Sequence, residues 1–109
     1  MVEFSDFLKL DIRVGTIIDA SINEGAKKPS YVLIIDFGAD IGIKKSSAQI
    51  TDLYAVDDLI NKQILAVVNF PPRQVAHVIS EVLVLGTYSD GKVVLIIPDR
   101  KVENGDKLG

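Results

Sequence analysis

The chain of 109 residues has no cysteine, which excludes a disulfide framework and a thiolate metal site and is consistent with a reducing compartment. It also has no long apolar run, since the longest runs, such as Ile64 to Val68, are far shorter than the roughly 20 residues that a membrane-spanning helix needs. The N-terminal stretch MVEFSDFLKLD carries acidic residues where a secretory signal would carry positive charge. We therefore predict a soluble, cytoplasmic protein with no membrane insertion.

Residues typical of catalysis are equally scarce. The single histidine, His77, has no carboxylates at metal-ligand spacing, and no serine lies in a G-x-S-x-G elbow. The pair Asp57-Asp58 is most simply solvated on the outer face of a short helix. We expect neither enzyme activity nor a metal or other cofactor, and we interpret His77 as a loop or interface residue.

The chain contains enough apolar residues to bury a hydrophobic core. Apolar residues make up 48% and charged residues 25%, which indicates one folded domain spanning residues 1–109. Because so small a body leaves some apolar area uncovered, the composition favours an oligomer or an apolar binding patch. The net charge of −3 means that any nucleic-acid contact must depend on a local basic patch.

Alternation of apolar and polar residues dominates the sequence. The stretch 10–22 is predicted to be a half-buried strand, with Gly15 marking a bulge or bend. The residues expected on its apolar face share one parity: Leu10, Ile12, Val14, Ile18, Ala20 and Ile22.

Further strands and one short helix follow this first strand. Strands are expected at 31–37, 41–50, 62–70, 80–88 and 92–98, and the last two are joined by the hairpin signal Asp90-Gly91. Between the third and fourth strands, Thr51 is expected to cap the helix. This order predicts an all-β fold, a five-stranded Greek-key barrel of the OB type with a helix between strands 3 and 4.

The predicted third strand is unusual because polar residues occupy both of its faces. Lys44 and Ser46 alternate with Lys45, Ser47 and Gln49, although burying such groups without partners costs several kcal/mol. The pattern leaves two interpretations open: an edge strand that emerges into solvent, or one wall of a polar groove that contacts phosphates and base edges. The second and third strands are where OB-folds usually bind oligonucleotides.

Basic residues are placed unevenly along the chain. Lys27-Lys28, Lys44-Lys45 and Arg73 would converge if the loops of an OB-fold flank one groove, and would otherwise be solvated. Pro71 and Pro72 stiffen the segment before Arg73, so Asn69 and Arg73 have little entropy left to lose on binding. The alternative is a rigid corner whose arginine is merely solvated.

Four stretches resemble the CsaA family, whose members are similar to the tRNA-binding domain at the C-terminus of methionyl-tRNA synthetases. They are LDIRVGTI, AKKPSYVL, DFGADIGIKKSSAQI and INKQILAVVNFPPRQVAHVISEVLVLG, within a likeness that extends from about Phe7 to Leu108. The resemblance implies an OB-fold homodimer with additional terminal elements. It also implies tRNA as a partner, and a chaperone role in protein export toward unfolded or precursor polypeptides.

Carried over by position, the resemblance and the polar pattern together give a set of expected RNA-binding residues. The set is Lys27, Lys28, Lys44, Lys45, Ser46, Ser47, Gln49, Asn69, Arg73, Ser80 and Glu81. Glu81 is the acid among them, for which we predict either pairing with Arg73 or acceptance of a hydrogen bond from a base amino group. Phe4, Phe7, Leu8 and the segment after Pro98 are candidates for the dimer interface, or for a plug over the end of the barrel.

Overall fold

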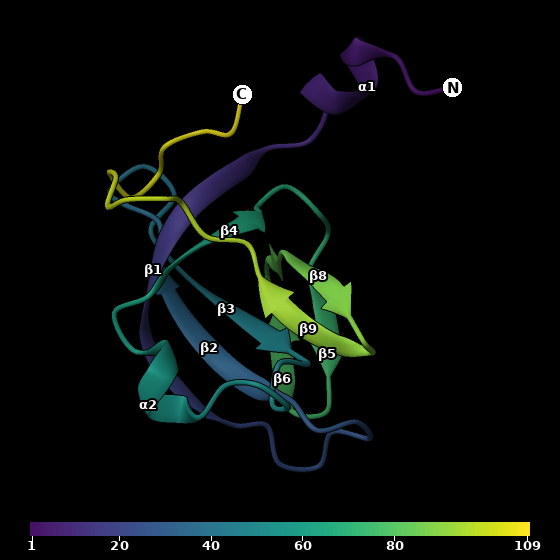
Figure 1. Ribbon diagram of the computed structural model, residues 1–109, viewed down its shortest axis with the longest axis vertical. Helices are drawn as coiled ribbons and strands as arrows, with labels where there is room; N and C mark the ends of the chain where they lie inside the picture. The colour runs from purple at the N-terminus through teal and green to yellow at the C-terminus, as the bar shows by residue number, and fades with distance from the viewer.

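A computed structural model describes all residues, 1–109. Nine strands and two short helices follow the chain, and α1 projects away from the body at the N-terminus (Figure 1). In chain order they are α1 (Phe4–Leu8), β1 (Ile12–Ile22), β2 (Tyr31–Asp36), β3 (Ile43–Ala48), α2 (Val56–Leu59), β4 (Gln63–Val67), β5 (Arg73–Val75), β6 (Val78–Ser80), β7 (Leu83–Val84), β8 (Gly86–Ser89) and β9 (Lys92–Leu95).

The main sheet has five antiparallel strands in the order β3-β2-β1-β4-β7. Its two edge strands approach one another, because the Glu81 N–H donates to the Lys45 carbonyl oxygen at 2.8 Å just before β7. The sheet is therefore a nearly closed barrel with α2 between β3 and β4, which confirms the predicted OB-like fold. The hairpins β5–β6 and β8–β9 are added to this barrel as two-stranded sheets.

Strand β1 is buried on both faces, and this differs from the prediction. Ile12 and Val14 pack in a small cluster with Leu65 and Val67, whereas Ile17 faces the main core on the opposite side. A bulge between Ile17 and Asp19 then shifts the register against β2. The predicted single apolar face is wrong because Ile18 and Ile22 are exposed while Ile17 is fully buried.

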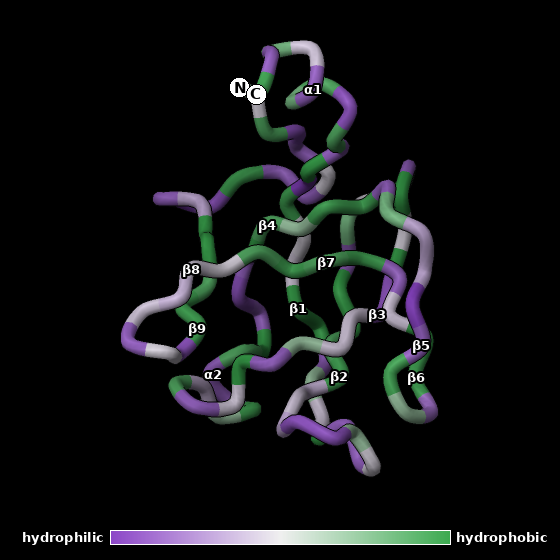
Figure 2. The backbone as a smooth tube through the Cα atoms, turned by 90° about the vertical axis from the view of Figure 1, so that its right-hand side faces the viewer, coloured by the Kyte–Doolittle hydropathy of each residue, from purple (hydrophilic) through white to green (hydrophobic).

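Gly15 lies at a close approach and not at the bulge itself. A Cβ atom there would lie 2.6 Å from Ile35 Cγ2 and 2.7 Å from Phe37 Cδ1, and both neighbours are in the core. The glycine thus lets β1 lie directly against β2 inside the barrel. Figure 2 shows that β4 and β7, which pair in the sheet, consist mainly of hydrophobic residues and cross the middle of the molecule.

The segment near the C-terminus completes β1 on the side that β4 does not cover. The Val14 N–H donates to the Asp106 carbonyl at 2.9 Å, and the Leu108 N–H donates to the Ile12 carbonyl at 2.9 Å. The Gln63 side chain holds the same segment by donating to the Val102 carbonyl at 2.8 Å and accepting from the Val102 N–H at 3.0 Å. No helix in the molecule is long and apolar enough to cross a membrane.

Two local predictions had different outcomes. Asp90 and Gly91, at φ of 52° and 75°, form the tight turn between β8 and β9, as the Asp-Gly signal predicted. The prediction that Thr51 caps the helix is wrong, because α2 begins after Ala55. The Ala55 N–H donates to the Asp58 carboxylate at 2.9 Å. Asp58 therefore caps the helix from inside its own first turn instead of being merely solvated, and Thr51 lies too early in the chain.

Candidate nucleic-acid interface

Three adjoining cavities surround Arg73 and form a groove over β3 and the β5–β6 hairpin. All three share Ser47 and Arg73 in their walls, so we treat them as one surface, the Arg73 groove. The Phe70 pocket, of about 360 Å³, is completed by Phe70, Pro71, Val75, Ser80, Glu81, Val82 and Leu83. The lysine pocket, of about 390 Å³, adds the segment 25–28, Ser30, Gln49 and residues 74–76, and the seam pocket, of about 340 Å³, adds residues 48–50, 83–86, Tyr88 and Val93.

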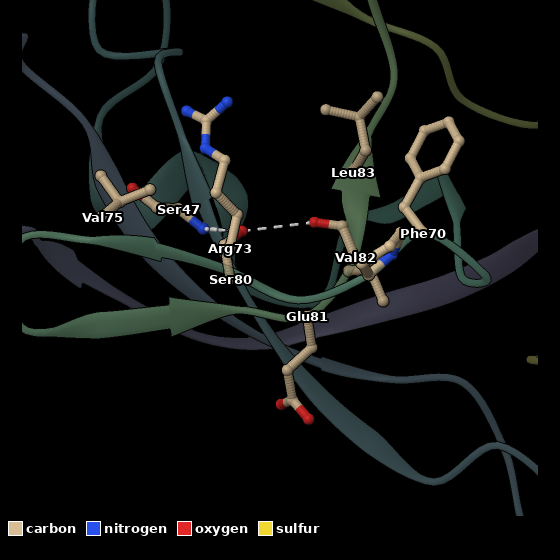
Figure 3. Close-up of a pocket in the computed structure, with 9 residues that line it drawn as sticks. Ser47, Phe70, Arg73, Val75, Ser80, Glu81, Val82 and Leu83 are labelled. Atoms are coloured by element: carbon tan, nitrogen blue, oxygen red, sulfur yellow. Dashed lines mark hydrogen bonds between the residues drawn. The ribbon is translucent and has the colours of Figure 1, made fainter.

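Arg73 begins β5 directly after the two prolines, in a corner where all peptide bonds are trans. It lies opposite Ser80 in the β5–β6 ladder, and its guanidinium has no hydrogen-bond or ion-pair partner in the protein. In Figure 3 the Arg73 side chain extends away from the hairpin, with Ser47 and Val75 on one side of it and Val82 and Leu83 on the other. Such a group retains all five of its donors for a ligand.

The polar residues on both faces of strand β3 lie in different surroundings, one face toward the core and the other toward solvent. Lys45, Ser47 and Gln49 point outward, and the last two line the groove. Ser46, at 1% exposure, points into the core, so its predicted place on the groove surface is wrong. The strand and the residue that follows it thus contribute the polar side chains of Ser47 and Gln49 to the wall of the Arg73 groove.

A buried amide, which the sequence reasoning missed, joins the parts of the groove. Asn23 follows β1 and is 6% exposed; its side-chain NH₂ donates to Ser47 Oγ at 3.0 Å and to the Val75 carbonyl at 3.4 Å. Its main-chain N–H donates to the Ser30 carbonyl at 2.9 Å, which closes the base of the loop that carries Lys27 and Lys28. Asn23 therefore connects the lysine loop, β3 and the β5–β6 hairpin.

Ser80 and Glu81 close the barrel with their side chains. Ser80 Oγ accepts from the Ser47 N–H at 3.0 Å and donates to the Val82 carbonyl at 3.4 Å (Figure 3). A Glu81 carboxylate oxygen accepts from the Lys45 N–H at 3.0 Å. These acceptors take the place of main-chain carbonyls in a regular sheet ladder.

Glu81 does not pair with Arg73, which was one of its two predicted roles. Its carboxylate points away from Arg73 (Figure 3). It lies 4.0 Å from the ammonium of Lys44. The Glu81 carboxylate therefore binds groups of β3, and it does not neutralise the charge of the Arg73 guanidinium.

Asn69 has a structural partner at each end of its amide. Its Oδ1 accepts from the Asp11 N–H at 2.9 Å, and its Nδ2 donates to the Lys9 carbonyl at 2.8 Å. Asn69 lines none of the three pockets of the groove. Its geometry fixes the segment between α1 and β1 to the end of β4.

The structure thus brings together part of the predicted set. Lys27, Lys28, Ser47, Gln49, Arg73, Ser80 and Glu81 line the Arg73 groove, whereas Lys44, Lys45, Ser46 and Asn69 do not. Sequence reasoning missed Phe70, Leu83 and Tyr88 in the walls. The signal available for Phe70 was a large apolar residue held beside two prolines.

The family model described as "Putative tRNA binding domain" matches residues 12–107, nearly the whole chain. A CsaA chaperone protein from Picrophilus torridus is 55% identical, with a TM-score of 0.95 and full coverage of both chains. The chain belongs to the CsaA family of tRNA-binding domains. A CsaA chaperone from Bacillus anthracis is 51% identical, with a TM-score of 0.93, and covers 100% of this chain and 99% of its own.

Ligases contain a related domain as part of a longer protein. The methionine–tRNA ligase of Parabacteroides distasonis is 33% identical over 110 residues, covering 98% of this chain but only 16% of the ligase. This CsaA-family chain thus spans about a sixth of that curated relative.

No group of three or more histidine, cysteine or carboxylate side chains is placed to hold a metal ion, and His77 lies exposed in the Ala76-His77 turn between β5 and β6.

Proposed function

We propose that this CsaA-family protein binds tRNA and that the Arg73 groove is its contact surface. The observation that carries the proposal is the unpaired guanidinium of Arg73 in a wall shared by three pockets, with Lys27 and Lys28 lining one of them. Arginine contacts phosphate in a bidentate manner, and lysine adds positive charge along the backbone of the nucleic acid. The family match to a tRNA-binding domain supports tRNA as the ligand.

The local charge of the groove is opposite to the charge of the whole chain. The net charge is −3, yet the groove presents Lys27, Lys28 and Arg73 against the single acid Glu81, which is turned away toward β3. Binding to RNA would therefore depend on this patch and weaken steeply with salt, because each neutralised phosphate releases counterions.

Filter retention of tRNA over a salt series tests the proposal. We expect Arg73→Ala to weaken binding and to reduce the slope of log K against log salt by about 1, the loss of roughly one phosphate contact. Arg100→Ala is the matched control, since Arg100 is an exposed arginine outside the groove that pairs with Asp99. Equal binding by wild type and Arg73→Ala would contradict the assignment of the groove.

The protein is further proposed to act as a homodimer, in which two grooves related by a twofold axis hold one folded tRNA. The support is α1, which projects from the body with Phe4 and Leu8 exposed at 73% and 57% (Figure 1). Apolar side chains exposed in this way are typical of an interface.

A second candidate function is export-related chaperone activity, the binding of unfolded polypeptide in apolar pockets near the dimer interface. The chaperone names of the two CsaA relatives and the exposed apolar side chains of α1 favour it. The same salt series separates the two functions, because apolar peptide binding should persist or strengthen as salt rises. Competition between an unfolded peptide and tRNA would show that one surface serves both.

A further inference from the structure

The Phe70 pocket is open between a charged planar group and an apolar wall. Arg73 stands on one side, Leu83 and Phe70 stand together on the other, and Val82 and Ser80 lie at the base (Figure 3). Phe70 is 42% exposed and Leu83 is 50% exposed, and neither is a member of the two core clusters. Both side chains line the pocket, so part of their apolar surface is open to a ligand.

The walls of the pocket are held in place before any ligand arrives. Pro71 and Pro72 restrict the backbone between Phe70 and Arg73, and β5 fixes Arg73 against Ser80 of β6. Opposite them, Leu83 pairs with Val67 of the buried strand β4. A ligand that fits between these walls gains contacts while ordering little additional chain.

We propose that the Phe70 pocket binds one unpaired nucleobase of an RNA, with the base between the Arg73 guanidinium and the Leu83–Phe70 wall. This inference rests on the proposed RNA-binding function and specifies the part of the RNA that the groove takes. Unstacked bases bind on aromatic side chains and on guanidinium planes, and the arginine also reaches the attached phosphate.

The size and charge of the pocket favour a base over other occupants. A cavity of about 360 Å³ lies at the small end of the range for ligand pockets, so it admits one nucleoside and not a duplex. An aliphatic peptide side chain would leave the guanidinium without an acceptor, since Glu81 is directed to Lys45. The lysine pocket, which shares Arg73, offers Lys27 and Lys28 to the neighbouring phosphates.

Two oligonucleotides test the proposal: a single-stranded oligouridylate of about eight nucleotides, and an abasic strand of the same length and charge. We expect Phe70→Ala to weaken binding of the base-bearing strand by about 5- to 150-fold, the range for loss of one stacked base, and to leave abasic binding unchanged. The salt slope should not change, because Phe70 contributes no charge. Phe70→Trp should retain or strengthen binding, since it keeps an aromatic face.

Leu53→Ala is the matched control, because Leu53 is similarly exposed, at 47%, and lies outside the groove. An equal loss on both strands in Phe70→Ala would overturn the base pocket, and so would equal binding of both strands by the wild type or binding of neither. Unchanged RNA binding in Phe70→Ala with weaker binding of an apolar peptide would assign the pocket to polypeptide instead.

The outcomes separate this inference from the proposed function. If Arg73→Ala weakens tRNA binding and lowers the salt slope while Phe70→Ala acts on both strands alike, the groove binds RNA without a base pocket. If Arg73→Ala binds tRNA as the wild type does, the proposed function itself fails.

Discussion

At the scale of single residues, several side chains fill hydrogen-bonding positions that the main chain occupies in a regular sheet. Glu81 accepts from the Lys45 N–H, Ser80 accepts from the Ser47 N–H, and Asn69 bridges Lys9 and Asp11. These polar residues looked like RNA ligands in the sequence because type alone does not distinguish a solvent-facing polar group from one bonded to the main chain.

Glu81 offers a direct test of this structural role. We expect Glu81→Ala to lower the free energy of unfolding by about 1–2 kcal/mol, since the Lys45 N–H loses a charged acceptor that is partly exposed. Glu81→Gln keeps an acceptor oxygen and should cost less than about 1 kcal/mol. Urea unfolding of both variants measures the difference.

RNA binding supplies the control for the same substitution. Glu81→Gln removes the negative charge from the wall of the Arg73 groove, so tRNA affinity should stay equal or rise. A marked loss of tRNA affinity in a stable Glu81→Gln protein would instead give Glu81 a direct role in RNA recognition.

At the scale of elements, the buried amide of Asn23 connects the lysine loop to the β5–β6 hairpin. We predict that Asn23→Ala and Lys28→Ala are not additive in tRNA binding, with a coupling of about 0.5–1.5 kcal/mol, because the lysine is positioned through the amide. A double-mutant cycle of tRNA affinities measures this coupling.

Asn104→Ala provides the comparison for that cycle. Asn104 accepts from Thr16 at 2.7 Å and from Gln63 at 3.1 Å, in a polar network remote from the groove. Its loss should change stability without coupling to Lys28. Coupling of similar size in both cycles would mean that general destabilisation, and not positioning, changes RNA binding.

The elements also show how far the sequence predicts the structure. Local signals succeeded, since Asp90-Gly91 sets the β8–β9 turn through its own backbone conformations. The face assignment of β1 failed because the strand packs on two clusters and changes register at the bulge after Ile17. Those facts depend on the pairing of β1 with β2 and β4, which no local period reveals. The sequence left open whether the basic residues converge or are solvated, and the structure brings Arg73 together with Lys27 and Lys28 but leaves Lys44 and Lys45 outside the groove.

At the scale of the whole molecule, the projecting α1 makes the oligomeric state the main question. We expect light scattering at micromolar concentration to give twice the mass of the chain, and Phe4→Asp with Leu8→Asp to give the mass of a monomer, since charge at an apolar interface opposes association. The double variant should also bind tRNA more weakly because only one groove remains on each particle.

Leu53→Asp is the matched control for charge on an exposed apolar residue outside α1. It should leave the mass unchanged. A wild-type protein that is a clean monomer at micromolar concentration would contradict the two-groove model.

Ser80 and Glu81 close the barrel partly through their side chains, so a single substitution at either position can affect how the barrel closes. A main-chain ladder is nearly indifferent to residue type, whereas this junction with β3 combines one main-chain bond with two bonds that depend on the identity of the Ser80 and Glu81 side chains. Because Ser80 and Glu81 also line the Phe70 pocket, a substitution at either position would alter the pocket and the closure of the barrel together.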